Sequence, residues 1–405
     1  MRHTQKLVLC VSLSLIVNVD VNDVWALPFT PKGGVGVRPQ DPPPVYHTFT
    51  EFDFQSLNLA LNQEYIELDL FHNGLARFSD AEFEAAGLNA NDRFLIEYMA
   101  DQEVGHAQLI TNMLGPTSAK QCIYEYPFHN VRQFLDFCQK LTRFGESGVY
   151  GFLPHLNQRP VAQLLTQSIT TEARQQFVFK QFEGAFPMAL HFTTGLPQAW
   201  AWTMLSPYLK SCPKDNPRII WQIFPALNIT NNPSIIDTTT SGEIVSFESG
   251  TEVYYPSTSP TQGPFYLAAL STNRTSLSFP GREVHFRWDL PGKKTSYDLS
   301  YTTHSTAKGP PKWALWVSQL NVTYTPLHNI NFASRTASTF QPGGIVFPPD
   351  DFPDSPVPGM KTYDNVAVND TMFIALVDRK IHVTPFNLSL INTHVVAGPA
   401  LYQAD

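Results

Sequence analysis

The chain has 405 residues, of which 43% are hydrophobic and 15% are charged, and its formal net charge is −8. This composition supports sizeable folded cores and excludes a largely disordered chain. The modest acidic charge, without any stripe of basic residues, argues against nucleic-acid binding and against an anionic membrane surface as a partner. The length suggests two or three domains.

The first 26 residues have the pattern of a secretory signal peptide. The basic residues Arg2 and Lys6 precede an apolar run from Leu7 to Val19, and Ala26 offers a small residue at a cleavage site. The run is too short to span a bilayer as a mature helix, and no other stretch is long and apolar enough. We therefore predict a secreted protein, extracellular or in the cell wall, with no membrane span after cleavage. Residues 27–46, rich in Pro and Gly, form a predicted linker.

N-x-S/T sequons give a second indication of secretion. All five lie after residue 227, at Asn228, Asn273, Asn321, Asn369 and Asn387. A single sequon arises easily by chance, but clustering in one half of the chain is typical of a glycosylated surface domain.

Three cysteines remain after Cys10 leaves with the predicted signal peptide. In an oxidising compartment, an odd number predicts one disulfide and one free thiol, or an intermolecular bridge. Cys138 lies in a helical run, where it fits as a small buried residue, whereas Cys122 and Cys212 lie in loops that flank the helices. We expect the disulfide to join Cys122 and Cys212. No CxxC spacing is present, which argues against a zinc site.

Residues 47–227 have helical periodicity and predict a four-helix bundle. The apolar stripes run over about 57–75, 96–113, 131–153 and 161–186. Three of them are interrupted near mid-helix by polar residues, which are Glu64 in the first, Glu103 and His106 in the second, and Ser168, Glu172 and Gln175 in the fourth. The third helix carries Glu146 on its stripe, between Gly145 and Gly148. The sequence therefore places carboxylates where a core is expected.

Several carboxylates that converge in one core cannot all stay ionised without a positive partner. Bundles that bind two iron or manganese ions use one Glu from each of two helices and a Glu-x-x-His from each of the other two. Glu64 and Glu146 fit the single glutamates, and Glu103 with His106 forms an intact Glu-x-x-His. We therefore predict a site for iron or manganese in the bundle.

The fourth helix departs from that pattern, because Gln175 stands where the second His is expected after Glu172. A Gln carbonyl is a weaker ligand than imidazole, so we expect one metal position to be weakened or lost. Glu67, one turn from Glu64, is predicted to be a surface residue or a partner of the ligands. A metal-free polar core that includes Arg143 or Arg174 is the competing interpretation of these stripes.

Six segments carry a resemblance to a known family: LALNQEYIELDLF, ADQEVGHAQLI, YEYPF, FGESGVYGFLPHL, SITTEARQQFVFKQFEG and QAWAWTMLSPYL. With them, residues 47–227 resemble the secreted ferritin-like proteins of fungi that are often described as stress-response proteins. They are also similar, more distantly, to plant desiccation-related proteins. The resemblance implies a four-helix bundle outside the cytoplasm, a link to starvation or desiccation, and the ligand set Glu64, Glu103, His106, Glu146 and Glu172. It implies no settled reaction.

Residues 232–405 change to the period-two pattern of half-buried strands. Apolar residues alternate from Val284 to Leu290, and again from Tyr297 to Tyr301, and the runs KWALWVSQLNVTY and TMFIALVDRKIHV are also typical of strands. Short strands separated by Pro, Gly and Asn turns predict an antiparallel β-sandwich-like domain. The expected fold class is thus α+β, with a helical bundle followed by this β-rich glycosylated domain.

Two functional hypotheses follow from the sequence. In the first, a secreted or cell-surface ferritin-like protein binds iron or manganese and serves stress protection, and a catalytic centre would react with oxygen or peroxide. In the second, the protein is a non-catalytic cell-wall or adhesion protein, in which the bundle is a scaffold and the β-rich domain contacts a wall polysaccharide or another protein. The Gln at position 175 leaves these hypotheses close to parity.

Overall fold

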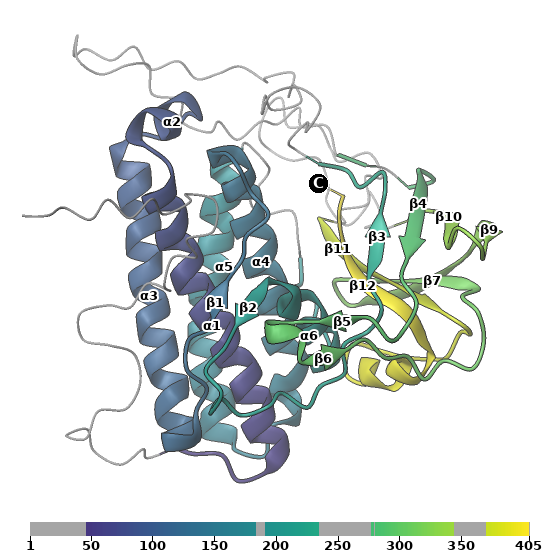
Figure 1. Cartoon of the computed structure of the whole chain (residues 1–405), viewed down its shortest axis with the longest axis horizontal. Helices are drawn as coiled ribbons and strands as arrows, with labels where there is room; N and C mark the ends of the chain where they lie inside the picture. The colour runs from purple at the N-terminus through teal and green to yellow at the C-terminus, as the bar shows by residue number, and fades with distance from the viewer. Residues whose placement is uncertain (1–45, 184–190, 235–276, 279, 344–369, 405) are drawn as a thin grey trace, which may run out of the picture.

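The computed structural model describes residues 46–183, 191–234, 277–278, 280–343 and 370–404. Helices make up the first part of the described chain and strands the second (Figure 1). The predicted signal peptide, nearly all of the predicted linker, and the sequons at Asn273 and Asn369 lie outside the described residues.

Four long helices form the bundle: α1 (Glu51–Arg77), α3 (Ala90–Leu114), α4 (Val131–Phe152) and α5 (Arg159–Phe182). Polar side chains accept hydrogen bonds at the starts of α1, α3 and α4, because the first backbone N–H groups of a helix need acceptors, whereas α5 has Pro160 in its first turn. At the start of α1, the side chain of Thr50 accepts a hydrogen bond from the backbone N–H of Asp53. At the start of α3, the side chain of Asn89 accepts hydrogen bonds from the first backbone N–H groups of that helix. None of the helices in the described ranges is long and apolar enough to cross a membrane.

Shorter helices and turns connect or follow the four long helices in the chain. They are α2 (Asp80–Ala85), α6 (Gln198–Leu205), and the 3₁₀ turns η1 (Gly115–Thr117), η2 (Leu153–His155) and η3 (Ser206–Tyr208). Strands β1 (Ile123–Tyr124) and β2 (Leu209–Ser211) pair beside a disulfide that joins Cys122 to Cys212. Cys138 is a free thiol buried in α4. The disulfide therefore ties the segment after α3 to the segment after α6.

Two four-stranded antiparallel sheets form the second part, which confirms the predicted sandwich-like fold. In sheet order, the first contains β3 (Leu227–Ile229), β4 (Glu283–Trp288), β10 (Thr336–Phe340) and β9 (His328–Asn331). The second contains β12 (Val395–Gln403), β11 (Thr371–Val377), β7 (Trp313–Ser318) and β8 (Asn321–Pro326). Phe286 and Trp288 of the first sheet pack with Trp316 of the second. The first strand of these two sheets in chain order, β3, begins at Leu227, which is the last residue of the predicted helical domain.

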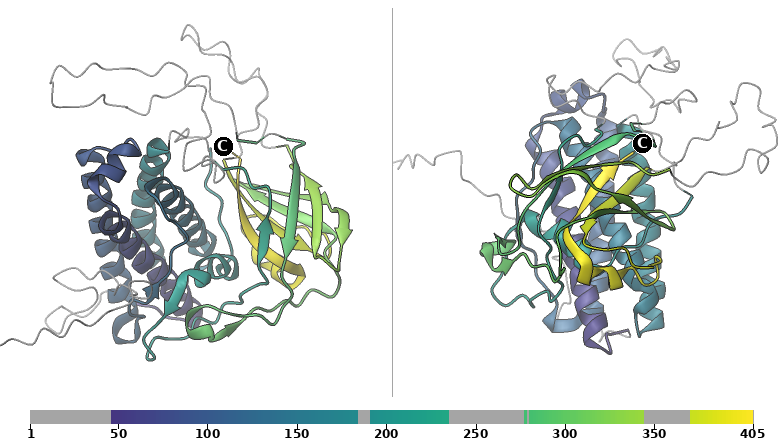
Figure 2. Two further views of the ribbon diagram at one scale, coloured as in Figure 1. Left: turned by 45° about the horizontal axis from the view of Figure 1, so that its top comes forward. Right: turned by 90° about the vertical axis from the view of Figure 1, so that its right-hand side faces the viewer.

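The second sheet also packs against the helices, so every residue of β11 is buried. Alternate side chains of a strand point to opposite faces. On β11, one set belongs to the core between the sheets (Met372, Ile374 and Leu376), and the other set belongs to the core of the bundle (Phe373, Ala375 and Val377). The sandwich lies along one side of the bundle, and α6, which contacts α4, α1 and β12, lies at the junction (Figures 1 and 2).

Parts of the predicted strands have other conformations. The alternation from Val284 ends at Trp288, and Leu290 is exposed, because the turn at Pro291 and Gly292 begins directly after it. Tyr297–Leu299 forms a 3₁₀ turn, η4, between the short strands β5 (Lys294–Thr295) and β6 (Tyr301–Thr302). Asp298 and Leu299 have φ values of 51° and 53°, which no extended strand can adopt. Another 3₁₀ segment, η6 (Leu388–His394), precedes β12.

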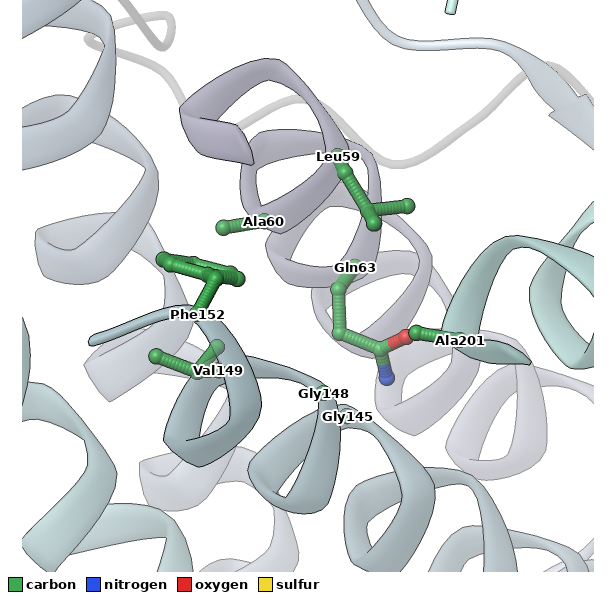
Figure 3. A pocket seen from close by; sticks show the side chains of 8 residues that line it. All are labelled: Leu59, Ala60, Gln63, Gly145, Gly148, Val149, Phe152 and Ala201. Carbon is green, nitrogen blue, oxygen red and sulfur yellow. The ribbon is translucent and has the colours of Figure 1, made fainter. Parts of the chain in front are cut away.

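Two glycines of α4, Gly145 and Gly148, allow its neighbours to approach closely. A Cβ atom at Gly148 would lie 2.8 Å from the Cβ of Ala201 on α6, and one at Gly145 would lie 2.5 Å from the side-chain nitrogen of Gln63 on α1. These residues line a small cavity between α1, α4 and α6 (Figure 3). The cavity is mostly apolar, and Gln63 is its polar member.

Candidate metal centre

Three long helices bring carboxylates together in the core of the bundle. Glu64 comes from α1, Glu103 from α3 and Glu172 from α5, and at most 1% of each residue is exposed. Each replaces an apolar residue in the stripe of its helix, so bundle packing directs its side chain inward. The structure thus places these three predicted ligands in one buried cluster.

His106 joins the cluster from α3, one turn after Glu103. Its Nδ1 lies 3.0 Å from Oε2 of Glu103 and 3.2 Å from Oε2 of Glu64. Residues three apart on a helix share a face, which explains why His106 and Glu103 both lie next to Glu64 of α1. The imidazole is mostly buried, with 11% of the side chain exposed.

Glu67 is also part of the cluster and is fully buried, which excludes the predicted surface position and leaves the other predicted role, a partner of the ligands. Its Oε1 accepts a hydrogen bond of 2.7 Å from the side chain of Gln63. One ligand atom each from Glu64, Glu67 and Glu103 lie within 4.8 Å of one another, and the same holds for Glu64, His106 and Glu172. Glu64 belongs to both groups, so the five residues form one continuous set of potential ligands.

Gln175 lies at the edge of the same cluster, where the sequence predicted a degenerate ligand. Its side-chain nitrogen donates to a carboxylate oxygen of Glu103 and, over 3.2 Å, to the amide oxygen of Gln102. Its own amide oxygen is buried and accepts no hydrogen bond. Gln175 therefore orients Glu103 and keeps one neutral oxygen available.

The cluster concentrates negative charge away from water. Burial, together with the charge of Glu172, raises the pKa of Glu64 well above its ordinary value, although His106 opposes the shift. Burial and the charge of Glu103 raise the pKa of Glu67, and burial and the charge of Glu67 raise the pKa of Glu172. Each of these carboxylates makes ionisation of the others more costly.

Glu103 and His106 behave as an ion pair inside this cluster. Burial acts to raise the pKa of Glu103, but the imidazolium of His106 and the hydrogen bonds from His106, Glu64 and Gln175 together lower it. Burial would likewise lower the pKa of His106, but Glu103 and Glu64 raise it to about 12. Without a metal ion, protons on His106 and the carboxylates balance the charge that a cation would otherwise balance.

Glu146 has a different set of partners, although it is equally buried. Its Oε2 accepts a hydrogen bond of 2.9 Å from Arg143, and its Oε1 accepts one of 3.3 Å from Thr193. It belongs to neither of the two ligand groups found among the described residues. The structure therefore does not group Glu146 with the potential metal ligands; it pairs with Arg143 on the same helix, although burial still raises the pKa of Glu146.

The two arginines considered for a polar core also have different positions. Arg143 is buried and pairs with Glu146, as that interpretation required. Arg174 is exposed and contacts Thr171 on its own helix. Arg143 additionally contacts Asp370, which the sequence analysis did not single out and which precedes β11.

Three of the predicted glycosylation sites lie in the described part of the second domain. Asn228 on β3 and Asn321 on β8 are exposed. Asn387, which precedes η6, is half-buried, and its side-chain oxygen accepts a hydrogen bond from the backbone N of Thr384. Two of the three sites are therefore open to modification.

Comparison with known proteins agrees with the helical bundle. A family model described as a ferritin-like domain matches residues 52–185, which contain all four long helices. Over 377 residues the chain is 47% identical to Protein rds1 of Schizosaccharomyces pombe, and this match covers 93% of the chain and 86% of the relative. The likeness extends over both the bundle and the sheets. The chain therefore belongs to the same family as Protein rds1 and contains a ferritin-like domain.

Proposed function

We propose that this chain is a metal-binding ferritin-like protein with its centre at the cluster in α1, α3 and α5. Glu64, Glu103, His106 and Glu172 would hold the metal, and Glu67 would serve as a further carboxylate ligand in place of Glu146. The observation that carries the proposal is the pair of overlapping ligand groups that share Glu64.

Unsatisfied atoms in the cluster fit a bound cation. Buried oxygens normally accept hydrogen bonds, and each exception needs an explanation. One carboxylate oxygen of Glu67, one of Glu172, and the amide oxygen of Gln175 are buried without such a partner. All three are potential metal ligands, and a cation would satisfy them together.

The chemistry of the donors favours iron or manganese. The cluster offers several carboxylate oxygens and one imidazole but no thiolate, and oxygen-rich sites suit harder cations than thiolate sites do. When bound, iron or manganese would supply redox chemistry with oxygen or peroxide. The residues themselves orient the ligands: Gln63 holds Glu67 and Gln175 holds Glu103.

We also propose that the protein is secreted and acts in stress protection. A disulfide between Cys122 and Cys212 is typical of an oxidising compartment. The N-terminal signal pattern and the exposed sequons at Asn228 and Asn321 support the same location. The stress role is proposed from the resemblance of the bundle motifs to secreted fungal stress-response proteins.

The metal content of the purified protein tests the proposal. Protein secreted from a eukaryotic host is dialysed against Mn²⁺ or, without oxygen, against Fe²⁺, and bound metal is measured by plasma mass spectrometry. The test variant is Glu103→Ala with His106→Ala. The matched control is Glu97→Ala with Asp101→Ala, which removes two exposed acidic residues from the same helix.

We expect wild type and control to retain one or two ions per chain and the test variant to lose them. Wild-type protein that holds no metal above background would refute the proposal. That result would instead favour the scaffold hypothesis, in which the buried carboxylates are held by protons and hydrogen bonds alone.

A further inference from the structure

A second buried group of charges lies where the sheet domain meets the bundle. Asp370, which directly precedes β11, accepts hydrogen bonds from Lys180 on α5 and from Arg143 on α4. Arg143 also donates to Glu146, so one guanidinium links the two carboxylates. Lys180 is fully buried, and Asp370 is 1% exposed.

This interdomain cluster, defined as Arg143, Glu146, Lys180 and Asp370, is electrically neutral. Two cations face two carboxylates, and Asp370 is the only one of the four that does not come from a bundle helix. Without the charge of Asp370, these four residues would carry one net positive charge. Unbalanced charges in a protein interior act over longer distances than charges in water, because little solvent screens them.

The interdomain cluster adjoins the metal centre. Glu146 directly follows Gly145, which lies against the side chain of Gln63, and Gln63 donates a hydrogen bond to Glu67 of the metal centre. Lys180 is on the same helix as Glu172, two turns away. An excess positive charge here would repel a metal cation in the centre.

We infer that Asp370 is a positioning residue of the metal centre, through which the sheet domain controls cation affinity in the bundle. It holds Arg143 and Lys180 and cancels their excess charge, and so keeps the carboxylates of α1, α3 and α5 available to the metal. This inference rests on the proposed function, and it gives the sheet domain a role within the centre.

The test is the affinity for Mn²⁺ of the full-length chain, measured by titration for wild type and three variants. In Asp370→Asn the side chain keeps its shape but loses its charge, and we expect the affinity to fall about tenfold. In Lys180→Met a cation is removed, and the affinity is expected to rise. The double variant should return to within about threefold of wild type, because its charges balance again.

The opposite signs separate electrostatics from structural damage, which would weaken binding in both single variants. Asp289→Asn is the matched control, because Asp289 pairs with Lys293 at the surface of the same domain, and its affinity should equal that of wild type. Circular dichroism checks folding, and if Asp370→Asn does not fold, the Lys180→Met and double variants still decide the matter. Weaker binding in Lys180→Met, or unchanged affinity in Asp370→Asn, would overturn the inference. A wild-type chain that binds no Mn²⁺ would refute the proposed function itself.

Discussion

Gly145→Ala is the perturbation whose outcome the structure defines best. An added Cβ would lie 2.5 Å from the side-chain nitrogen of Gln63, so Gln63 must move. It would lose a hydrogen bond of 2.7 Å to Glu67 and one of 3.2 Å to the carbonyl of Leu141. The Leu141 carbonyl is a neutral acceptor, and burial raises the pKa of Glu67, which favours its neutral form in the metal-free protein. A hydrogen bond between neutral groups contributes about 0.5–1.5 kcal/mol.

Alanine also favours the helix by about 1 kcal/mol relative to glycine, which offsets part of this loss. The free energy of unfolding should therefore fall by up to about 2 kcal/mol. Gly105→Ala is the matched control, because an added Cβ on this exposed position of α3 meets no atom within 4 Å. There the helix preference acts alone, and stability should rise by about 1 kcal/mol.

Urea unfolding of the metal-free proteins, followed by tryptophan fluorescence, measures both changes. Metal affinity should also fall in Gly145→Ala, because Gln63 no longer holds Glu67. If Gly145→Ala proved as stable as Gly105→Ala, the close contact between α1 and α4 would be refuted, and with it the account of how Glu67 is positioned.

Three further predictions concern single groups. Because folding raises the pKa of Glu172 above 4.5, the folded state holds its proton longer than the unfolded state does. Stability of the metal-free protein should therefore fall as the pH rises above about 4.5, and thermal melts at several pH values should show a smaller fall and greater neutral-pH stability for Glu172→Gln. Cys138, whose pKa burial raises, should react with thiol reagents only after unfolding, and rapid labelling of the native protein would contradict its position. Replacing Cys122 and Cys212 by Ser should lower the free energy of unfolding by up to about 4.6 kcal/mol, because the bond closes a loop with a separation of 90 residues; an unchanged urea midpoint would argue against the pairing.

The long helices were predictable because their apolar stripes are regular. Glu64, Glu103, His106 and Glu172 interrupt those stripes, and such an interruption is visible in the sequence. The sequence left Glu67 open between a surface position and a partner of the ligands, because Glu67 lies off the apolar stripe of α1. The helix is buried over most of its length on several faces, so a position off the stripe can also be internal. The number of polar residues in α1, among them Asn58, Gln63 and Glu67, was the feature of the sequence that could have indicated a polar interior.

Contacts between distant segments could not be predicted in this way. Glu146 has the right spacing for a ligand, yet its charge is balanced by Arg143, and Arg143 is held by a residue 227 positions later in the chain. Asp370 follows no pattern that identifies it, because it precedes a strand that is buried on both faces. The spacing of apolar residues shows which face of a helix or strand is buried. It does not show which side chain of another domain packs against that face.

The most direct test of the metal centre is an anomalous difference map from crystals of the protein loaded with Mn²⁺. We expect density for manganese in the bundle, bounded by the carboxylates of Glu64 and Glu172 and by His106, with Glu146 still paired to Arg143. Manganese bound at Glu146, or a bundle without any anomalous peak at saturating Mn²⁺, would contradict the account.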